Sequence, residues 1–219
     1  MIPLLHDFSE EAVLVFGGGP VGARKARRFA REARVVVVSP AFADAEFGNA
    51  ERVRAAPSPA NVPEWFERIE PALAVAATDD EAVNDAVARV ARERGTLRNR
   101  ADRSGGAVNR SNLDVTVPAT IRDDPVLLAI ATGGTSPALS RYLRERFEEE
   151  FAGVGAMATL TGELREQLRE DTPAEQRRAA VRAVVRSDRV WKALGDGTRS
   201  PDQEAQSVIS DVLSEMNER

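Results

Sequence analysis

Short apolar runs alternate with amphipathic stretches along the first part of the chain. Residues 12–17 (AVLVFG) and 34–40 (RVVVVSP) predict β-strands, and residues 23–33 (ARKARRFAREA) predict a helix between them. Four consecutive valines are typical of a strand that is buried on both faces of a sheet. The pattern therefore predicts a β-α-β unit with parallel strands.

The same alternation continues toward residue 102. After a turn-rich segment and the polar lead-in EWFERIEPA, residues 73–78 predict another buried strand. Residues 80–95 place Ala and Val at helical spacing with Gly95 as the C-cap, and residues 96–102 predict the next strand end. We therefore predict an α/β fold, a Rossmann-like domain with a parallel sheet over residues 1–112.

A polar, glycine-containing stretch, RSGGAVNRSNLD (103–114), predicts a loop or a domain border. Two apolar runs at 115–121 and 125–132 then predict strands, with Arg122, Asp123 and Asp124 as the turn between them. Residues 136–151 predict a helix with Ser136 as N-cap and Pro137 in its first position. Together, residues 113–152 form a segment of two strands and a helix.

The remainder of the chain is amphipathic and helical. Three helices are predicted, in ATLTGELREQLRE, TPAEQRRAAVRAVVRS and SPDQEAQSVISDVLSEMNER. We assign residues 153–219 to a small all-helical C-terminal domain.

Composition restricts the location and the chemistry. No stretch approaches the roughly 20 apolar residues of a membrane helix, and the N-terminus lacks the basic start and cleavage site of a secretory signal, so we expect a cytoplasmic protein without a membrane partner. The chain has no cysteine, which excludes disulfides, thiolate metal sites and cysteine nucleophiles. No metal site is predicted. The net charge of −5 arises from interleaved acidic and basic residues, so we expect no nucleic-acid partner.

Gly17, Gly19 and Gly22 match G-x-G-x-x-G between the first strand and the first helix. In that context the first glycine permits a tight turn, the second lets a pyrophosphate approach the backbone, and the third lets helix and strand pack closely. The helix N-terminus supplies free N–H groups and a partial positive charge. The motif predicts a bound dinucleotide.

The second strand ends in Ser39 and Pro40, where an NAD site usually carries Asp or Glu for the ribose hydroxyls. A serine hydroxyl can also bind ribose. No basic residue follows immediately to favour a 2′-phosphate, so the sequence favours NAD over NADP.

Several motifs occur in a characteristic order: VLVFGGGPVGARKARRF, AVAATDD followed by VN, the N-x-x-D of Asn99 to Asp102, VTVPATI and IATGGTSPALSRYLRERFE. In these motifs the chain resembles the precorrin-2 dehydrogenase/sirohydrochlorin ferrochelatase family, which includes the N-terminal domains of siroheme synthases. The resemblance covers about residues 2–150 and is weaker in the helical tail. TGGTSP is its most specific part.

The resemblance implies an NAD-dependent dehydrogenation of precorrin-2 to sirohydrochlorin in siroheme and modified tetrapyrrole biosynthesis, sometimes combined with iron insertion. It also implies a homodimer, in which residues 113–152 are a dimerisation segment that intertwines with its partner and both chains contribute to the active site.

Within the resemblance, Pro20 and Val21 lie at the tip of the glycine turn against the pyrophosphate. Ala41 and Phe42 match the stretch that lines the adenosine, and Thr78 ends the next strand, where open α/β sheets bind ligands.

Asp102 matches the family's central acid/base. Removing a hydride and a proton from precorrin-2 requires a base, and the same carboxylate would accept pyrrole protons in a chelatase. The alternative is an aspartate that only caps a loop.

Thr132, Gly133, Gly134, Thr135 and Ser136 match the family's glycine-rich segment. Two hydroxyls and the N–H groups of a helix start would bind the carboxylates of the tetrapyrrole. The alternative is that Ser136 only caps its helix, and both roles are compatible.

Arginines flank the matched motifs, at positions 100, 103, 110 and 141. They suit carboxylate recognition, but in so arginine-rich a chain we expect solvated surface charges and assign none to the site.

Three alternatives differ from the main hypothesis. A bifunctional enzyme would also insert Fe²⁺ into sirohydrochlorin. A non-catalytic NAD-sensing protein would need the glycine turn but neither Asp102 nor TGGTSP, and a pure chelatase would need Asp102 but no nucleotide site. The stretch 103–114 is longer than in the family, which leaves the substrate entrance and metal insertion open.

Overall fold

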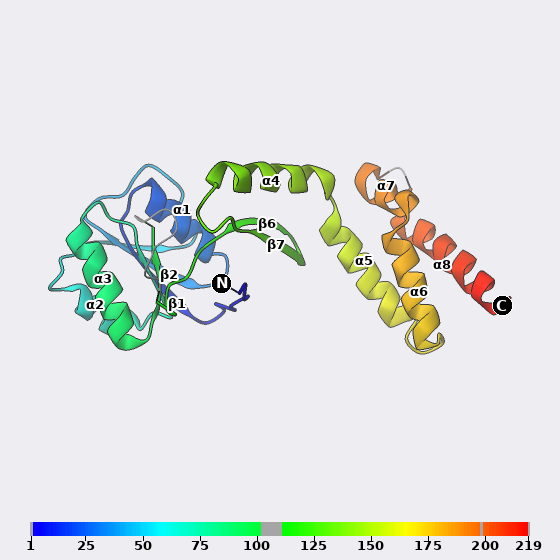
Figure 1. The fold of residues 1–219 in the computed structure, drawn as a ribbon, viewed down its shortest axis with the longest axis horizontal. Coiled ribbons are helices and arrows are strands. Elements are labelled where there is room, and N and C mark those ends of the chain that lie inside the picture. The colour runs from blue at the N-terminus through cyan, green and yellow to red at the C-terminus, as the bar shows by residue number, and fades with distance from the viewer. Residues whose placement is uncertain (1, 102–110, 198, 219) are drawn as a thin grey trace. The chain divides into compact units, whose positions relative to one another are not determined.

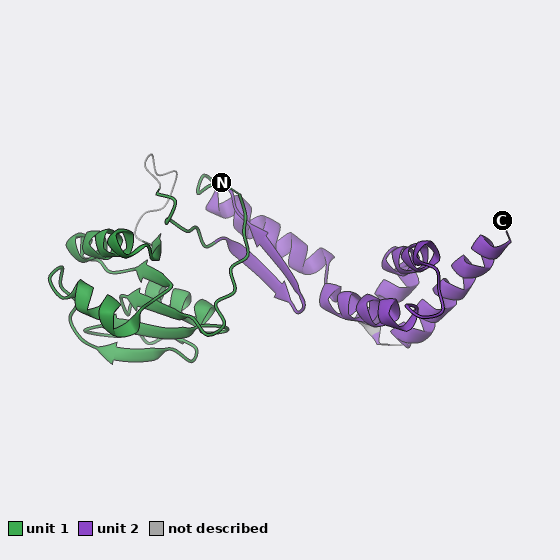
Figure 2. Ribbon diagram, turned by 90° about the horizontal axis from the view of Figure 1, so that it is seen from below, with its two compact units in different colours: residues 1–117, 133–135 green, residues 118–132, 136–219 purple. Residues whose placement is uncertain are grey.

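The structure, a computed structural model, describes residues 2–101, 111–197 and 199–218. Its chain divides into two compact units, Met1–Val117 with Gly133–Thr135 and Pro118–Thr132 with Ser136–Arg219 (Figure 2). Each unit has a hydrophobic core of its own. The division into three domains after residues 112 and 152 stays a prediction.

Unit 1 is built on a five-stranded parallel sheet with the strand order β3-β2-β1-β4-β5. The strands are β1 (Ala12–Phe16), β2 (Arg34–Ser39), β3 (Glu51–Arg54), β4 (Leu73–Ala76) and β5 (Leu97–Arg100). This arrangement confirms the predicted α/β class. The order places β2 and β4 on opposite sides of β1, which is the point where such sheets bind ligands.

Helices cover both faces of the sheet (Figure 1). They are α1 (Pro20–Phe29), α2 (Val62–Ile69) and α3 (Glu81–Arg94). On β1, Val13 and Val15 belong to the core beneath α1, whereas Leu14 and Phe16 belong to the core beneath α2 and α3. Burial on both faces is the physical reason for the uninterrupted apolar runs of β1 and β2.

The ends of α3 follow the sequence prediction. The Asp80 carboxylate accepts the N–H groups of Ala82 (2.9 Å) and Val83 (3.2 Å), and Gly95 takes the left-handed C-cap conformation with φ 69°.

Two elements of unit 1 correct the sequence analysis. The turn-rich segment contains the edge strand β3, and the polar lead-in contains α2, which buries Val62, Phe66 and Ile69. These three residues lie at helical spacing, but the helix is only eight residues long and three charged residues lie among them, so the apolar stripe is short.

Unit 2 contains an antiparallel hairpin of β6 (Ala119–Asp123) and β7 (Val126–Ile130), followed by helix α4 (Pro137–Glu150). Ser136 caps α4 as predicted, because its Oγ accepts the Leu139 N–H at 3.3 Å. The predicted turn at 122–124 is wrong for its first two residues. Both belong to β6, and the chain turns at 124–125.

The C-terminal part holds four described helices, not the predicted three. They are α5 (Val154–Gln167), α6 (Ala174–Val185), α7 (Asp188–Asp196) and α8 (Pro201–Asn217). The additional helix α7 buries Val190 and Ala193 in spite of its short length. Within the described residues, no helix is long and apolar enough to cross a bilayer.

Candidate dinucleotide-binding site

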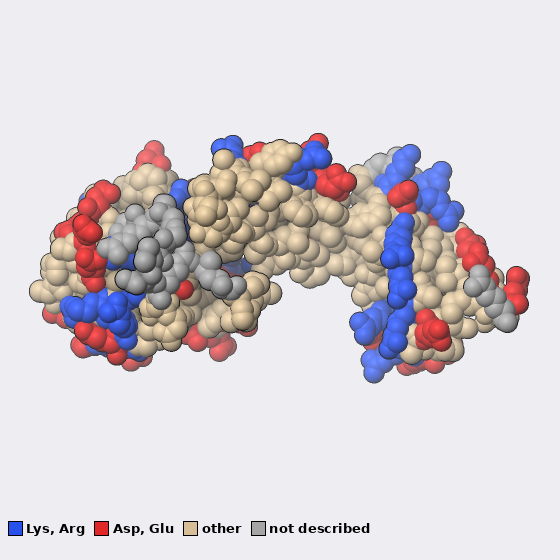
Figure 3. Space-filling view, in the orientation of Figure 1, with Lys and Arg blue, Asp and Glu red and all other residues tan. Residues whose placement is uncertain are grey.

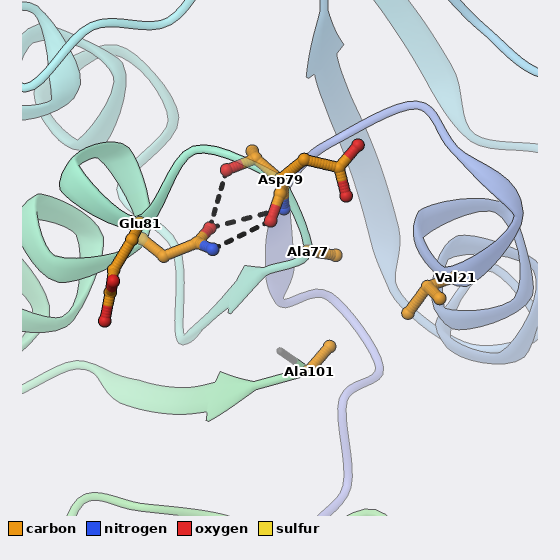
Figure 4. Close-up of a pocket in the computed structure, with 7 residues that line it drawn as sticks. Val21, Ala77, Asp79, Glu81 and Ala101 are labelled. Atoms are coloured by element: carbon orange, nitrogen blue, oxygen red, sulfur yellow. Dashed lines mark hydrogen bonds between the residues drawn. The ribbon is translucent and has the colours of Figure 1, made fainter. Parts of the chain in front are cut away.

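The site lies at the carboxyl ends of β1 and β4, where the strand order of the sheet reverses. A cavity of about 490 Å³ opens there, between the first turn of α1 and the start of α3 (Figure 4). It is lined by Val21, Ala77, Thr78, Asp79, Glu81, Asn84 and Ala101. Its position is the crevice in which open α/β sheets hold nucleotides.

Close packing requires two of the three predicted motif glycines. Gly17 has φ 117°, and a Cβ there would lie 2.2 Å from the Ala77 carbonyl oxygen. A Cβ on Gly22 would lie 1.9 Å from the Gly17 carbonyl oxygen. Both positions therefore exclude any larger residue, and together they hold α1 close to the ends of β1 and β4.

Gly18, which the sequence analysis did not assign, is equally constrained. A Cβ there would lie 2.3 Å from the Ala41 carbonyl oxygen and 2.8 Å from Phe42 Cδ1, and the Ala43 N–H donates to the Gly18 carbonyl at 2.8 Å. Three consecutive glycines were the available signal. This glycine packs the turn against the stretch that follows β2.

Gly19 differs from the other glycines of this turn, because a Cβ there would meet nothing within 4 Å. It is the N-cap of α1 without a side-chain cap, Pro20 follows, and the first turn holds no acidic residue. The N–H groups of a first helical turn have no intrahelical acceptors and attract anions. The open space in front of Gly19 therefore fits the pyrophosphate of a dinucleotide.

The residues predicted for the adenosine side lie next to this turn. Ser39 is buried, and its hydroxyl donates to the Ala41 carbonyl at 2.7 Å, so its proton is engaged in the backbone turn. Phe42 is half-buried and packs edge-on against Phe47, with ring centroids 5.6 Å apart. The structure thus brings the Ser39–Phe42 stretch and the glycine turn together.

Thr78 lines the cavity, but its hydroxyl is held by Asn84 at 2.8 Å. The Asn84 side chain also accepts the Thr78 N–H at 3.2 Å and donates to the Thr78 carbonyl at 2.8 Å (Figure 4). Asn84 is 1% exposed, so this buried amide fixes the loop between β4 and α3. The site prediction omitted Asn84, although it lies in the VN of the matched motif.

The predicted acid/base Asp102 lies outside the described residues. The chain on either side is tied together, because the buried Arg98 forms an ion pair with the partly buried Asp114 and the Asn99 amide donates to the Val115 carbonyl at 2.9 Å. Burial alone would raise the pKa of Asp114, but the Arg98 hydrogen bond, the Ser111 N–H and the Arg98 charge outweigh it and lower this pKa below its ordinary value.

Lys25 lies one turn beyond Gly22 on α1 and is half-buried. Burial lowers the pKa of its ammonium group to about 8, and the charges of Arg28 and Arg24 act in the same direction. Helix α1 therefore carries an ammonium group, that of Lys25, which the fold keeps partly out of water.

The predicted substrate segment, Thr132 to Ser136, leads into α4. Gly133 and Gly134 have φ values of 63° and 84°. The Thr132 hydroxyl accepts the Ser136 N–H at 3.3 Å and lies 3.1 Å from the Ser140 hydroxyl. The hydroxyls of Thr132 and Ser136 thus shape the entry into α4, which the capping alternative expects.

The flanking arginines that the structure describes form ion pairs. Arg100 pairs with Asp85 at 2.5 Å, and Arg141 pairs with Glu145 at 2.8 Å along α4. Figure 3 shows basic and acidic side chains interspersed along this helix. Positions 103 and 110 lie outside the described residues, and the part of the chain that is described holds no cluster of three or more His, Asp or Glu able to bind a metal.

Comparison with known proteins supports this reading of the cavity. A family model described as "Putative NAD(P)-binding" matches residues 4–119, which confirms a nicotinamide dinucleotide as the cofactor class. The precorrin-2 dehydrogenase of Methanosarcina barkeri is 30% identical over 99% of this chain and 96% of its own length.

Siroheme synthases match over most of this chain but less than half of their own length. Those of Nitrosomonas europaea and Azotobacter vinelandii are 30% and 34% identical, with 43% and 37% of their lengths covered. The solved structure of SirC, a precorrin-2 dehydrogenase, superimposes with a TM-score of 0.68 at 21% identity, covering 96% of this chain and 100% of that one. That likeness confirms the fold.

Proposed function

Since the chain belongs to the precorrin-2 dehydrogenase family, we propose that it oxidises precorrin-2 to sirohydrochlorin with NAD as the hydride acceptor. The observation that carries this proposal is the match of nearly the whole chain to nearly the whole of a precorrin-2 dehydrogenase. The glycine turn and its open cavity supply the dinucleotide site that the reaction needs.

Different residues of the chain would bind the cofactor and accept the proton. Main-chain groups from Gly17 to Gly22 would hold the pyrophosphate, and Ala41 and Phe42 would border the adenosine. The Thr78 loop, which Asn84 fixes, borders the cavity. When bound, NAD would supply the acceptor for the hydride that leaves the tetrapyrrole. The accompanying proton requires a base, and we assign this role to Asp102 on its motif match.

The segment Thr132–Ser136 is our candidate for the substrate carboxylates. Its glycines leave the backbone accessible, and the first N–H groups of α4 attract anions. The cap of α4 is compatible with this role, because the Ser136 hydroxyl accepts the Leu139 N–H through its oxygen, and a hydroxyl that accepts a hydrogen bond can still donate its own proton to a carboxylate.

We also propose a homodimer formed through unit 2. None of the fourteen residues of α4, all of them described, is buried, and Leu139, Tyr142 and Phe151 are 46%, 57% and 42% exposed. A two-stranded hairpin such as β6–β7 is marginal without further packing. A second copy of the chain would cover this apolar surface. Size-exclusion chromatography with light scattering tests it: the wild type should run as a dimer and Tyr142→Glu as a monomer.

The decisive experiment incubates the protein with precorrin-2 and NAD and follows NADH and sirohydrochlorin absorbance. We expect both to rise together. Asp102→Asn should abolish turnover while NAD binding stays unchanged, and Asp171→Asn, an exposed carboxylate in the C-terminal part, is the matched control. NAD binding without any NADH formation would instead support the non-catalytic sensor.

The same assay also tests the alternative of a bifunctional enzyme that inserts a metal into sirohydrochlorin. Fe²⁺ or Co²⁺ is added after sirohydrochlorin has formed, and a metallated product would show chelatase activity. The siroheme synthases share less than half of their length with this chain and do not favour metal insertion. The proposed place of action is the cytoplasm, where we expect the protein to draw on the free dinucleotide pool.

A further inference from the structure

The edge strand β3 brings a cation beside the end of β2. In the parallel register, Arg54 is the partner of Ser39, and the Ala55 N–H donates to the Ser39 carbonyl at 3.1 Å. Neighbouring strands lie about 4.8 Å apart, whereas an arginine side chain reaches farther than that. The guanidinium of Arg54 therefore has the carboxyl end of β2 within its range.

The contacts of β3 settle which face Arg54 uses. Val53 packs into the core beneath α2 and α3, whereas Arg52 lies over the rings of Phe42 and Phe47, at 5.8 and 5.6 Å. Side chains alternate along a strand, so Arg54 shares the face of Arg52. That is the face of Phe42, which touches the glycine turn at Gly18.

The charges at this position are those that a phosphate requires. Arg54 is exposed, and no ion pair among the described residues involves it. The end of β2 carries Ser39 and Pro40 in place of the carboxylate that would repel a 2′-phosphate. The nearest later carboxylates are Asp44 and Glu46, and Glu46 is paired with Arg27 at 3.6 Å.

We propose that Arg54 forms a subsite for the 2′-phosphate of the adenosine ribose, so that the protein binds NADP as well as NAD. This inference rests on the proposed function only for the presence of the dinucleotide. Arginine binds phosphate through charge-assisted, bidentate hydrogen bonds. Sequence reasoning found no basic residue here because Arg54 follows Ser39 by fifteen positions and reaches it only through strand pairing.

The test is direct binding, by titration calorimetry, of NAD⁺, NADP⁺, 5′-AMP and 2′,5′-ADP to the full chain without precorrin-2. The wild type should bind NADP⁺ within about ten-fold of NAD⁺, and 2′,5′-ADP more tightly than 5′-AMP. Arg54→Gln should weaken NADP⁺ and 2′,5′-ADP about ten-fold or more and leave NAD⁺ within about two-fold. Arg54→Glu should weaken the phosphorylated ligands further, and higher salt should reduce their advantage.

Arg34→Gln is the matched control, because it removes the same charge from the opposite end of β2. Equal losses for Arg54→Gln and Arg34→Gln, or equal losses of NAD⁺ and NADP⁺, would overturn the proposal. So would a wild type that rejects NADP⁺ while Asp44→Asn accepts it, since Asp44 would then be the ribose carboxylate. These outcomes are independent of turnover, so a protein that fails to oxidise precorrin-2 leaves the binding result intact.

Discussion

Replacing Gly19 with alanine should separate cofactor binding from folding. The backbone at Gly19 is extended, with φ −74° and ψ −179°, a conformation that alanine adopts freely, and the new Cβ would meet no protein atom within 4 Å. The stability change should stay within about 1 kcal/mol, because a lower unfolded-state entropy offsets a slightly poorer N-cap. The methyl group would instead occupy the space in front of the first turn of α1.

The expected loss of affinity follows from the hydrogen bonds at stake. A pyrophosphate held away from the turn loses one or two charge-assisted bonds, each worth about 1.5–3 kcal/mol. At about 1.4 kcal/mol per factor of ten, this corresponds to a rise in the Kd for NAD of about ten-fold for one weak bond and about 10⁴-fold for two strong ones. Titration calorimetry measures the affinity, and urea unfolding of the same preparation measures the stability.

Gly22→Ala is the matched comparison. Its Cβ would lie 1.9 Å from the Gly17 carbonyl oxygen, so α1 must move and both stability and binding should fall, with a destabilisation of about 1–3 kcal/mol. If Gly19→Ala bound NAD as the wild type does, the pyrophosphate would not lie at this turn. If it lost as much stability as Gly22→Ala, the space in front of Gly19 would not be open.

Three further substitutions test the electrostatics and capping around the site. Lys25→Met should stabilise the protein at pH 7 by about 1–3 kcal/mol, because the folded-state pKa of Lys25, about 8, lies below the ordinary 10.5. Urea unfolding should show this gain vanish between pH 8 and 10.5, and a gain that does not depend on pH would contradict the explanation. Asp80→Ala should cost about 1 kcal/mol in thermal unfolding by removing the α3 cap, and Asp80→Asn should restore most of it. Asp114→Asn should lower the free energy of unfolding by about 2 kcal/mol at pH 7, because it weakens the pair with Arg98. The folded-state pKa of Asp114 is lowered, so the difference in stability between variant and wild type should shrink as the pH falls below 3.8 through that pKa. A difference that stays constant with pH would refute the role of this ion pair.

Local signals made the core of unit 1 predictable from the sequence. The strand, glycine turn and helix of residues 12–29 are contiguous, and α3 has its cap at Asp80 and its stop at Gly95. The same holds for Ser136 at the start of α4. In each case the residues that determine the conformation lie within a few positions of one another.

The elements that were missed depend on partners far along the chain. β3 has the sequence ERVR, and only its pairing with β2 makes it a strand. The short helices α2 and α7 are stabilised by their buried stripes and not by strong propensity. Arg54 beside Ser39 follows from such strand pairing, so neighbouring residues in the sequence do not indicate this contact. Asn84 differs, because it lies only six residues from Thr78 and its motif was an available signal.

The staple made by Arg98 with Asp114 and by Asn99 with Val115 separates the sheet from the chain between Ala101 and Ser111. Once both ends of such a segment are fixed, the entropy of closing it grows only with the logarithm of its length, at about 0.6 kcal/mol per doubling. The staple therefore fixes the points at which the chain leaves unit 1 after Ala101 and re-enters it at Ser111, which keeps the nucleotide cradle in place whatever the number of residues between these two points.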